Sequence, residues 1–334
     1  MAFDKVVDST QLNAELTSVA NAIRTKGGTS AQLVFPAGFV SAVQAIKTGA
    51  SIQLVVTTSA GAAVTAAKGS KTVTGTAGTD GTCTFTLDDT GEYTITVAKS
   101  GVTRTETIQI GTVSIYVPLY DPVLANNSWA QIAEACRAGT IPETWTVGSS
   151  KSMTINGADY QVDIIGLNHD DYADGSGKAP LTFQLHDCYA DTKMNSSNTN
   201  SGGWTSCAMR QTHLPAILAL LPTEVQSSIR EVNKLTSAGS QMSTIKTTAD
   251  KLFLLSEVEI FGSVKYSKSG EGTQYDYYAS GNSKVKRRSG AARDWWTRSP
   301  YGSNSVNFCF ASSNGTADFD GASNACAAVF AFCF

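Results

Sequence analysis

The sequence predicts a multidomain protein in which a short helical segment precedes a β-sandwich and a larger α+β domain. The chain has 334 residues, more than one hydrophobic core usually supports. Its apolar residues follow a helical period up to about residue 50 and a period of two up to about residue 120. Helical and strand-like stretches then mix between Gly-, Ser- and Asn-rich loops, which is typical of α+β structure. We therefore expect domains at residues 1–50, 51–120 and 121–334.

Residues 1–50 have the pattern of two short helices. Four apolar residues recur at helical spacing and form one stripe: Leu12, Leu16, Val19 and Ile23. Asp8 or Ser9 can cap this helix, Gly27 and Gly28 end it, and a second helix is expected after Pro36. Because two short helices are marginally stable alone, the stripe should contact a partner helix or another subunit. The alternative is a hairpin packed on the next domain.

Residues 51–120 have the two-residue period of β-strands. The Thr- and Val-rich runs are 52–56, 71–74, 82–87, 93–97 and 107–110. Turn-forming clusters such as Thr79-Asp80-Gly81 separate these runs. The pattern predicts a small antiparallel sandwich.

Residues 121–334 combine both kinds of element. Helices are expected at 130–136, 214–221 and 223–232, a strand at 160–166, and an apolar strand or buried segment at 251–255. Long loops between these elements are where a rigid scaffold often carries its functional residues.

Composition excludes several classes of function. The net charge of −3 gives no electrostatic reason to expect nucleic acid or an anionic membrane as partner. No segment approaches the roughly twenty apolar residues of a membrane-spanning helix. The first residues lack the charged-then-apolar plan of a signal peptide. A protein made in the bacterial cytoplasm and released by lysis as part of a virion would fit these facts.

The cysteines do not form a recognisable metal or redox motif. Their number is odd and no C-x-x-C pair occurs. The seven are Cys83, Cys136, Cys188, Cys207, Cys309, Cys326 and Cys333. We expect reduced, mostly buried thiols.

Three motifs carry a family resemblance over about two hundred residues of the C-terminal domain. They are Gly203–Arg210 (GWTSCAMR), Asp250–Gly262 (DKLFLLSEVEIFG) and Trp295–Pro300 (WWTRSP). In this order they resemble a domain of phage and bacterial surface proteins that is similar to the C-type-lectin-like fold, in the branch shared with formylglycine-generating enzymes. Residues 89–93 resemble the tyrosine corner of immunoglobulin-like domains. Residues 20–39 resemble the openings of phage tail or baseplate-associated proteins.

The tail after the third motif resembles the variable region of proteins diversified by retroelements, at about residues 297–326. This resemblance implies a changeable ligand-binding surface. The candidate ligand-binding residues are Tyr301, Val306, Asn307, Phe310, Ser312, Thr316, Asp318, Phe319, Asp320 and Asn324. Such aromatic anchors among short polar groups are typical of antibody paratopes. We expect Tyr301, Phe310, Asp318 and Phe319 to lie on one exposed face.

The tail departs from the family pattern at several positions. Thr297 stands where the family has Leu, and Ala327, Ala328 and Phe330 stand where it has Gly, Val and Pro. These departures concern the packing of the last strand rather than the fold.

Rival functions have weaker support. A formylglycine-generating-type oxidase would need activated, paired thiolates, and Cys309, Cys326 and Cys333 have apolar aromatic neighbours. Residues 170–175 superficially resemble a calcium loop, but Tyr172 and Leu181 occupy ligand positions, so a solvated acidic loop without calcium is expected.

The remaining polar and aromatic motifs have structural interpretations. The basic run 284–288 is expected to be a solvated loop rather than a nucleic-acid site. His169, His186 and His213 have no ligand spacing and should be structural. At least one of Trp295 and Trp296 should anchor the core.

The sequence therefore predicts a phage tail-associated receptor-binding or adhesion protein rather than an enzyme. Its expected partners are a host cell-surface protein or glycan and, through the N-terminal segment, other tail proteins. A homotrimer is expected, with no cofactor, metal, nucleic acid or membrane insertion. The alternatives are a structural virion decoration protein without a specific ligand and, third, the oxidase.

Overall fold

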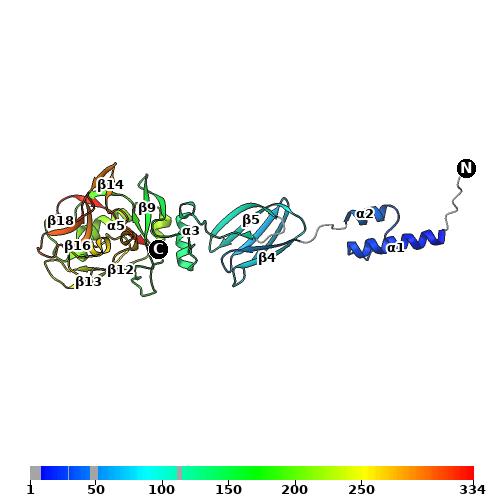
Figure 1. Ribbon diagram of the computed structural model, residues 1–334, viewed down its shortest axis with the longest axis horizontal. Coiled ribbons are helices and arrows are strands. Elements are labelled where there is room, and N and C mark those ends of the chain that lie inside the picture. Colours follow the sequence, from blue (N-terminus) through cyan, green and yellow to red (C-terminus); the bar gives the residue numbers. More distant parts are fainter. Residues whose placement is uncertain (1–8, 29, 46–51, 111–114) are drawn as a thin grey trace. The chain divides into compact units, whose positions relative to one another are not determined.

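The protein is β-rich and multidomain, with short helices (Figure 1). The computed structural model describes residues 9–28, 30–45, 52–110 and 115–334. The chain divides into two compact parts, Met1–Lys99 with Thr105–Val117 and Ser100–Arg104 with Pro118–Phe334. Within the described residues, no helix is both long and apolar enough to cross a membrane.

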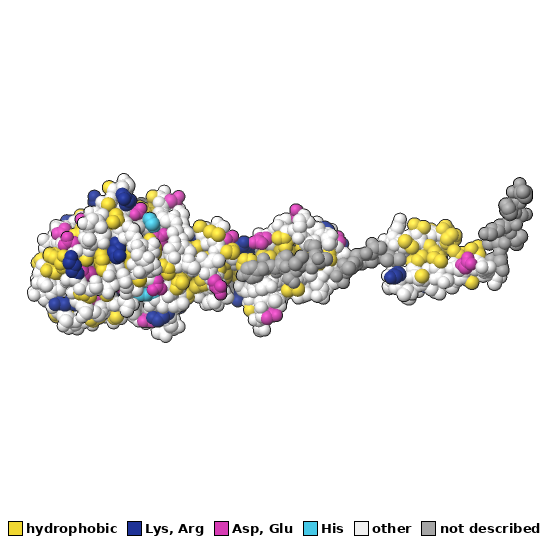
Figure 2. Space-filling model, in the orientation of Figure 1, with side chains coloured by type: hydrophobic (Ala, Val, Ile, Leu, Met, Phe, Trp, Pro, Cys, Tyr) yellow, Lys and Arg dark blue, Asp and Glu magenta, His cyan; other side chains and the backbone are white. Residues whose placement is uncertain are grey.

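The two predicted N-terminal helices are confirmed as α1 (Ser9–Gly27) and α2 (Ala37–Ala45). Gly28, with φ +64°, follows α1 in the left-handed conformation that glycine favours at helix ends. Ile23 is buried, whereas Leu12 and Val19 are 43% and 49% exposed. Figure 2 shows apolar side chains gathered on this helical segment. The predicted cap at Asp8 lies outside the described residues.

The predicted sandwich region contains two sheets. In spatial order they are β4 (Thr82–Leu87), β1 (Ile52–Thr57) and β7 (Ile115–Tyr116), and β3 (Lys71–Thr76), β2 (Ala63–Lys68), β5 (Gly91–Lys99) and β6 (Val102–Ile110). Alternate residues of β1 and β5 are buried, as the two-residue period requires. The Tyr93 hydroxyl lies 2.8 Å from Asp89 Oδ1 and 3.2 Å from the Asp89 carbonyl oxygen, and this contact pins the entry of β5.

The C-terminal part contains four sheets. In spatial order they are β20 (Ala331–Cys333), β10 (Leu181–Leu185), β9 (Ala158–Leu167) and β8 (Ser150–Ile155); β11 (Ala190–Thr192), β19 (Cys326–Ala328), β16 (Trp295–Pro300), β17 (Asn307–Ala311) and β18 (Ala317–Gly321); β12 (Val232–Ser237) and β13 (Ile245–Asp250); and β14 (Lys286–Arg288) and β15 (Ala291–Arg293). Most residues of the candidate site lie on β17, on β18 and on the loops that flank these two strands.

Short helices join these sheets. They are η1 (Leu124–Asn126), α3 (Trp129–Ala138), α4 (Gly203–Ser206), η2 (Met209–His213), α5 (Leu214–Leu218), α6 (Thr223–Ser228), α7 (Glu257–Phe261) and α8 (Asp276–Ala279). Helix α3 begins with a capping box formed by Ser128 and Gln131. The helix predicted over 223–232 is too long, because the chain becomes extended at Ile229 and Val232 begins β12.

Both tryptophans at the start of the tail anchor the core, as predicted for at least one of them. Trp295 and Trp296 are fully buried. Their indole N–H groups donate to the Lys284 and Thr192 carbonyl oxygens at 2.9 and 3.0 Å. Because large buried aromatics with satisfied N–H groups hold their position strongly, β16 is a fixed base for the residues that follow it.

Candidate functional site

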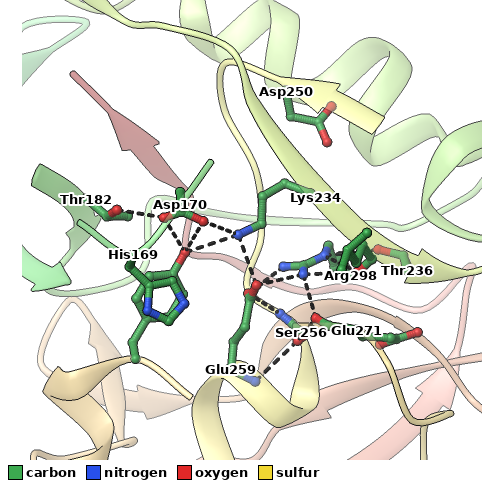
Figure 3. Close-up of polar contacts among 12 residues, drawn as sticks. His169, Asp170, Thr182, Lys234, Thr236, Asp250, Ser256, Glu259, Glu271 and Arg298 are labelled. Carbon is green, nitrogen blue, oxygen red and sulfur yellow. Dashed lines mark hydrogen bonds and ion pairs between the residues drawn. The ribbon is translucent and has the colours of Figure 1, made fainter. Parts of the chain in front are cut away.

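A buried charge network holds β16 to the rest of the domain (Figure 3). Arg298 of β16 is fully buried and forms a bidentate pair with Glu259 of α7, at 2.5 and 2.8 Å. The Lys234 ammonium lies 2.9 Å from Glu259 and 2.6 Å from Asp170. The network is so deeply buried that its role is structural: it fixes the strand from which the tail emerges.

Electrostatics keep this network ionised. Burial alone would raise the pKa of Glu259, but Arg298 and Lys234 hold it below its ordinary value. Asp170 is likewise buried, and Lys234 and Thr182 hold its pKa below the ordinary value. The expectation of a solvated acidic loop at 170–175 is therefore wrong for Asp170, because its carboxylate is the buried counter-ion of Lys234.

The three motifs of the C-terminal domain meet around these contacts. Asp250 accepts hydrogen bonds from Trp204 at 2.9 Å and from Arg210 at 2.5 Å, which joins the first motif to the second. The Arg298–Glu259 pair joins the second motif to the third. Residues far apart in the sequence thus form one continuous frame.

Asn200 fixes the loop that follows β16. This side chain is fully buried, and its amide nitrogen lies 3.3, 3.0 and 2.8 Å from the carbonyl oxygens of Tyr301, Asn304 and Asn307. Its amide oxygen accepts from the Ser240 N–H at 2.8 Å. One amide therefore holds the loop at three points, which is an effective way to order backbone without regular structure.

Glu257 fixes a second loop against the tail. Its buried carboxylate accepts from the Tyr266 and Ser267 backbone N–H groups at 3.0 and 2.7 Å. The Gly302 N–H in turn donates to the Tyr266 carbonyl oxygen at 2.8 Å. Tyr266 is therefore held beside the first residues of the tail.

These two loops and β18 build an aromatic cluster of Tyr266, Tyr301 and Phe319. The Tyr301 and Phe319 rings stack with centroids 4.0 Å apart and planes 6° from parallel. The Tyr266 ring meets Phe319 edge-on at 5.1 Å. All three side chains are partly exposed. The exposed Lys265 ammonium lies 4.7 Å from the Tyr266 ring centroid, so the cluster has a cationic border.

The expectation of one exposed face for Tyr301, Phe310, Asp318 and Phe319 is wrong. Side chains alternate across a strand, so the neighbours Asp318 and Phe319 of β18 point to opposite sides. Phe310 pairs with Asp318 and is 8% exposed, with its ring edge-on to Trp296 at 6.1 Å. Phe310 therefore belongs to the core, while Asp318 is exposed.

A polar surface lies on the other side of β18 from Phe319. Asn324 donates to Asp320 at 2.6 Å. The Asp318 and Asp320 carboxylates also accept from the next backbone N–H, those of Phe319 and Gly321, at 2.9 and 2.7 Å. Since β18 is the edge of its sheet, these carboxylates occupy N–H groups that face away from β17.

The remaining candidate residues are divided between the ends of the β17–β18 hairpin. Val306, 39% exposed, and Asn307, partly exposed, lie in or next to the loop that Asn200 holds. Ser312 and Thr316 lie in the opposite loop, with hydroxyl oxygens 2.9 Å apart. The ten predicted residues therefore form an aromatic cluster, a polar strand side and two loop ends, with Phe310 in the core.

The basic run 284–288 is only partly the solvated loop that the sequence predicts. Lys286 is buried, and its ammonium donates to the Leu185 and His186 carbonyl oxygens at 2.8 and 2.7 Å. Burial lowers the pKa of Lys286 to about 8. Arg287 and Arg288 are exposed.

Two histidines make structural contacts, as predicted. His169 stacks on Tyr275 with ring centroids 3.9 Å apart. His186 Nδ1 lies 2.6 Å from Asp163, and this hydrogen bond raises the pKa of His186 against the opposing effect of burial. Neither contact suggests a metal ligand, and the described residues contain no group of three potential metal ligands.

All seven cysteines are buried and free, as predicted. Burial raises the pKa of Cys326 to about 12, and those of Cys309 and Cys333 well above the ordinary value. Thiols in this environment stay protonated and are poor nucleophiles. The cysteines of the tail are therefore buried, unactivated thiols.

Sequence reasoning missed Asn200, Glu257 and Tyr266. Asn200 lies in a Ser- and Asn-rich stretch that looks like an ordinary loop. Glu257 is the first residue of α7, next to the capping box of Ser256 and Glu259, and Tyr266 is isolated among Ser and Lys residues. Only the capping box gives a signal in the sequence, and it predicts a helix start rather than a contact with the tail.

Residues 181–330 match the model of a family described as a domain of unknown function, DUF6273. The match covers less than half of the chain and extends from β10 to just before β20. It includes Lys234, Glu259 and Arg298 of the charge network but not Asp170, together with the aromatic cluster and the whole tail hairpin. A comparison with curated proteins finds no match.

Proposed function

We propose that this protein is a receptor-binding or adhesion protein of a phage tail, released with the virion at lysis. Its C-terminal domain would display a changeable ligand-binding surface on a C-type-lectin-like scaffold. The observation that carries the proposal is the partly exposed aromatic cluster of Tyr266, Tyr301 and Phe319 above a rigid buried frame. Rigid aromatic anchors on a fixed scaffold are favourable for recognition because little side-chain entropy is lost on binding.

The remaining parts of the chain have supporting roles in this proposal. The tyrosine contact between Tyr93 and Asp89 favours an immunoglobulin-like spacer. The exposed apolar side chains of α1 and α2 favour attachment to tail proteins and assembly into a homotrimer, which would gain avidity from several linked binding faces. Buried thiols with raised pKa values argue against the oxidase.

Binding to cells tests the proposal. Fluorescently labelled full chain is mixed with intact cells of a panel of bacterial strains that includes the source of the gene. We expect saturable binding to some strains and at least tenfold weaker binding by Tyr301→Ser and Phe319→Ser, with folding checked by thermal melting. The matched control is Tyr160→Ser, since Tyr160 is also partly exposed and lies 5.4 Å from another aromatic ring, Tyr189, outside the tail.

The second candidate, a decoration protein without a ligand, predicts a different result. Absence of binding to every strain, or equal binding by the tail variants and the wild type, would favour it. The flanking DNA provides an independent test. A reverse-transcriptase gene and a near-copy of the coding tail that differs at template adenines would support diversification.

Light scattering tests the trimer. The full chain is expected to have three times the mass of one chain, and a variant lacking residues 1–50 is expected to be monomeric. A full chain that stays monomeric at high concentration would contradict assembly through this segment.

A further inference from the structure

A small polar pocket lies beside the tail, away from the aromatic cluster. Its volume is about 180 Å³, and its lining residues are Ala292, Arg293, Asp294, Ser313, Ala325 and Cys326. Ser313 belongs to the loop between β17 and β18, at the opposite end of this hairpin from the Asn307–Gly321 pair. The pocket is smaller than the roughly 300–1,000 Å³ of typical drug-sized sites, so it suits one compact group.

Arg293 forms one wall of the pocket and belongs to an ion-pair cluster with Asp191 and Arg288, which do not line the pocket. Arg293 lies 2.6 Å from Asp191 Oδ2, and Arg288 lies 2.9 Å from the same oxygen. Two guanidinium groups thus share one carboxylate oxygen. Asp191 is the one side chain with which Arg293 forms a hydrogen bond among the residues that the structure describes. A planar guanidinium with free N–H groups is well suited to a carboxylate ligand.

The opposite wall carries groups of another kind. One oxygen of Asp294 accepts from the Ser313 backbone N–H at 2.6 Å. Within the described residues, its second oxygen and the Ser313 hydroxyl form no hydrogen bond. A carboxylate oxygen only accepts hydrogen bonds, so a ligand here must offer donors, whereas a hydroxyl group can donate or accept. These lining groups therefore favour a ligand that carries hydroxyl groups as well as a negative charge.

We propose that this pocket binds a hexuronate, a six-membered sugar ring bearing a carboxylate, within an acidic surface polysaccharide. Arg293 binds the carboxylate, Asp294 and Ser313 bind ring hydroxyls, and Ala292 and Ala325 contact the carbon atoms of the ring. A neutral sugar offers the remaining N–H groups of Arg293 no charged acceptor, and the carboxylate of an acidic peptide side chain has no hydroxyl to donate to Asp294. This inference deepens the proposed function because it names a ligand class for the displayed surface.

Ligand-observed NMR of the full chain tests the pocket with four probes: D-glucuronic acid, D-galacturonic acid, D-glucose and a capped Gly-Glu-Gly peptide. We expect at least one of the two uronates to bind with a Kd in the millimolar range, and at least tenfold weaker binding of glucose and the peptide. Arg293→Gln should weaken uronate binding at least tenfold, and Ser313→Ala about threefold. Arg287→Gln is the matched control, because Arg287 is an exposed arginine on the same β14–β15 hairpin.

Several results would overturn the proposal: binding of neither uronate, equal binding of glucose, or equal losses in Arg293→Gln and Arg287→Gln. Peptide binding as strong as uronate binding would replace the glycan with an acidic protein ligand. Thermal melting separates loss of the pocket from loss of the fold, and Ser313→Ala leaves the backbone contact to Asp294 intact. Failure of the pocket does not depend on cell binding through Tyr301 and Phe319, so the two proposals can fail separately.

Discussion

Replacing Asn200 by alanine should lower the stability of the C-terminal domain, because the buried amide of Asn200 holds the loop that follows β16. The amide has two hydrogens, which its three carbonyl contacts share, and its oxygen accepts one further hydrogen bond. The side chain can therefore make three hydrogen bonds at once, two as a donor and one as an acceptor. Their loss, at about 1 kcal/mol each, lowers the stability by about 3 kcal/mol. For a domain of roughly 200 residues this lowers Tm by about 6–12 °C.

Differential scanning calorimetry of the full chain measures this loss in the transition of the C-terminal domain. The matched control is Asn198→Ala. Asn198 is exposed, and its oxygen accepts from the Ser323 N–H and hydroxyl at 3.0 and 2.7 Å. Surface contacts of this kind change stability by only about 0.5 kcal/mol. A loss below about 1 kcal/mol for Asn200→Ala, or equal losses for the two variants, would refute the reasoning.

Two further predictions concern tail burial and pH. Phe310→Ser should cost roughly 3–5 kcal/mol in chemical denaturation because its ring is buried against Trp296, whereas Phe319→Ser should cost clearly less; equal costs would contradict the assignment of Phe310 to the core. Burial raises the pKa of Glu271 from 4.5 to about 7, so the folded state keeps a proton that the unfolded chain loses near pH 4.5, and stability falls as pH rises from about 4.5 to 7. Glu271→Gln should remove this loss, gaining up to roughly 3 kcal/mol over the wild type at pH 8 and little at pH 4.5, since a tenfold change in proton affinity corresponds to about 1.4 kcal/mol. Urea denaturation at both pH values measures the difference, and a gain that does not change with pH would contradict the prediction.

The sequence predicts elements well where one strong local signal decides the structure. The stripe and the glycines of residues 9–28 define α1, and alternation defines β1, β4 and β5. The strand β2 escaped prediction because its Ala-Val-Thr-Ala-Ala-Lys run has little contrast between its two faces. Alternation therefore predicts a strand only where its buried face and its exposed face differ clearly in residue type.

The geometry of the candidate residues was not predictable from the sequence. In β17 the run Asn-Phe-Cys-Phe-Ala places apolar residues on both faces, and every residue after Asn307 is buried, so alternation alone does not show that Phe310 belongs to the core. The burial of Phe310 depends on the register between β16 and β17, which pairs it with Trp296. Similarly, nothing local marks Lys234 as the partner of Asp170 and Glu259, because that contact depends on how distant segments pack.

The two aspartates of β18 affect how this edge strand behaves when several chains are close together. An open strand edge is a template on which another chain can add a strand, and the danger grows when many copies are held close together. Asp318 and Asp320 occupy the outward N–H groups of Phe319 and Gly321 and add negative charge, which disfavours the addition of another strand at this edge. If the tail is diversified as proposed, variants that lose both carboxylates would leave this strand edge open to pairing with other chains and would aggregate. Poor solubility would then remove such variants before they could bind a ligand.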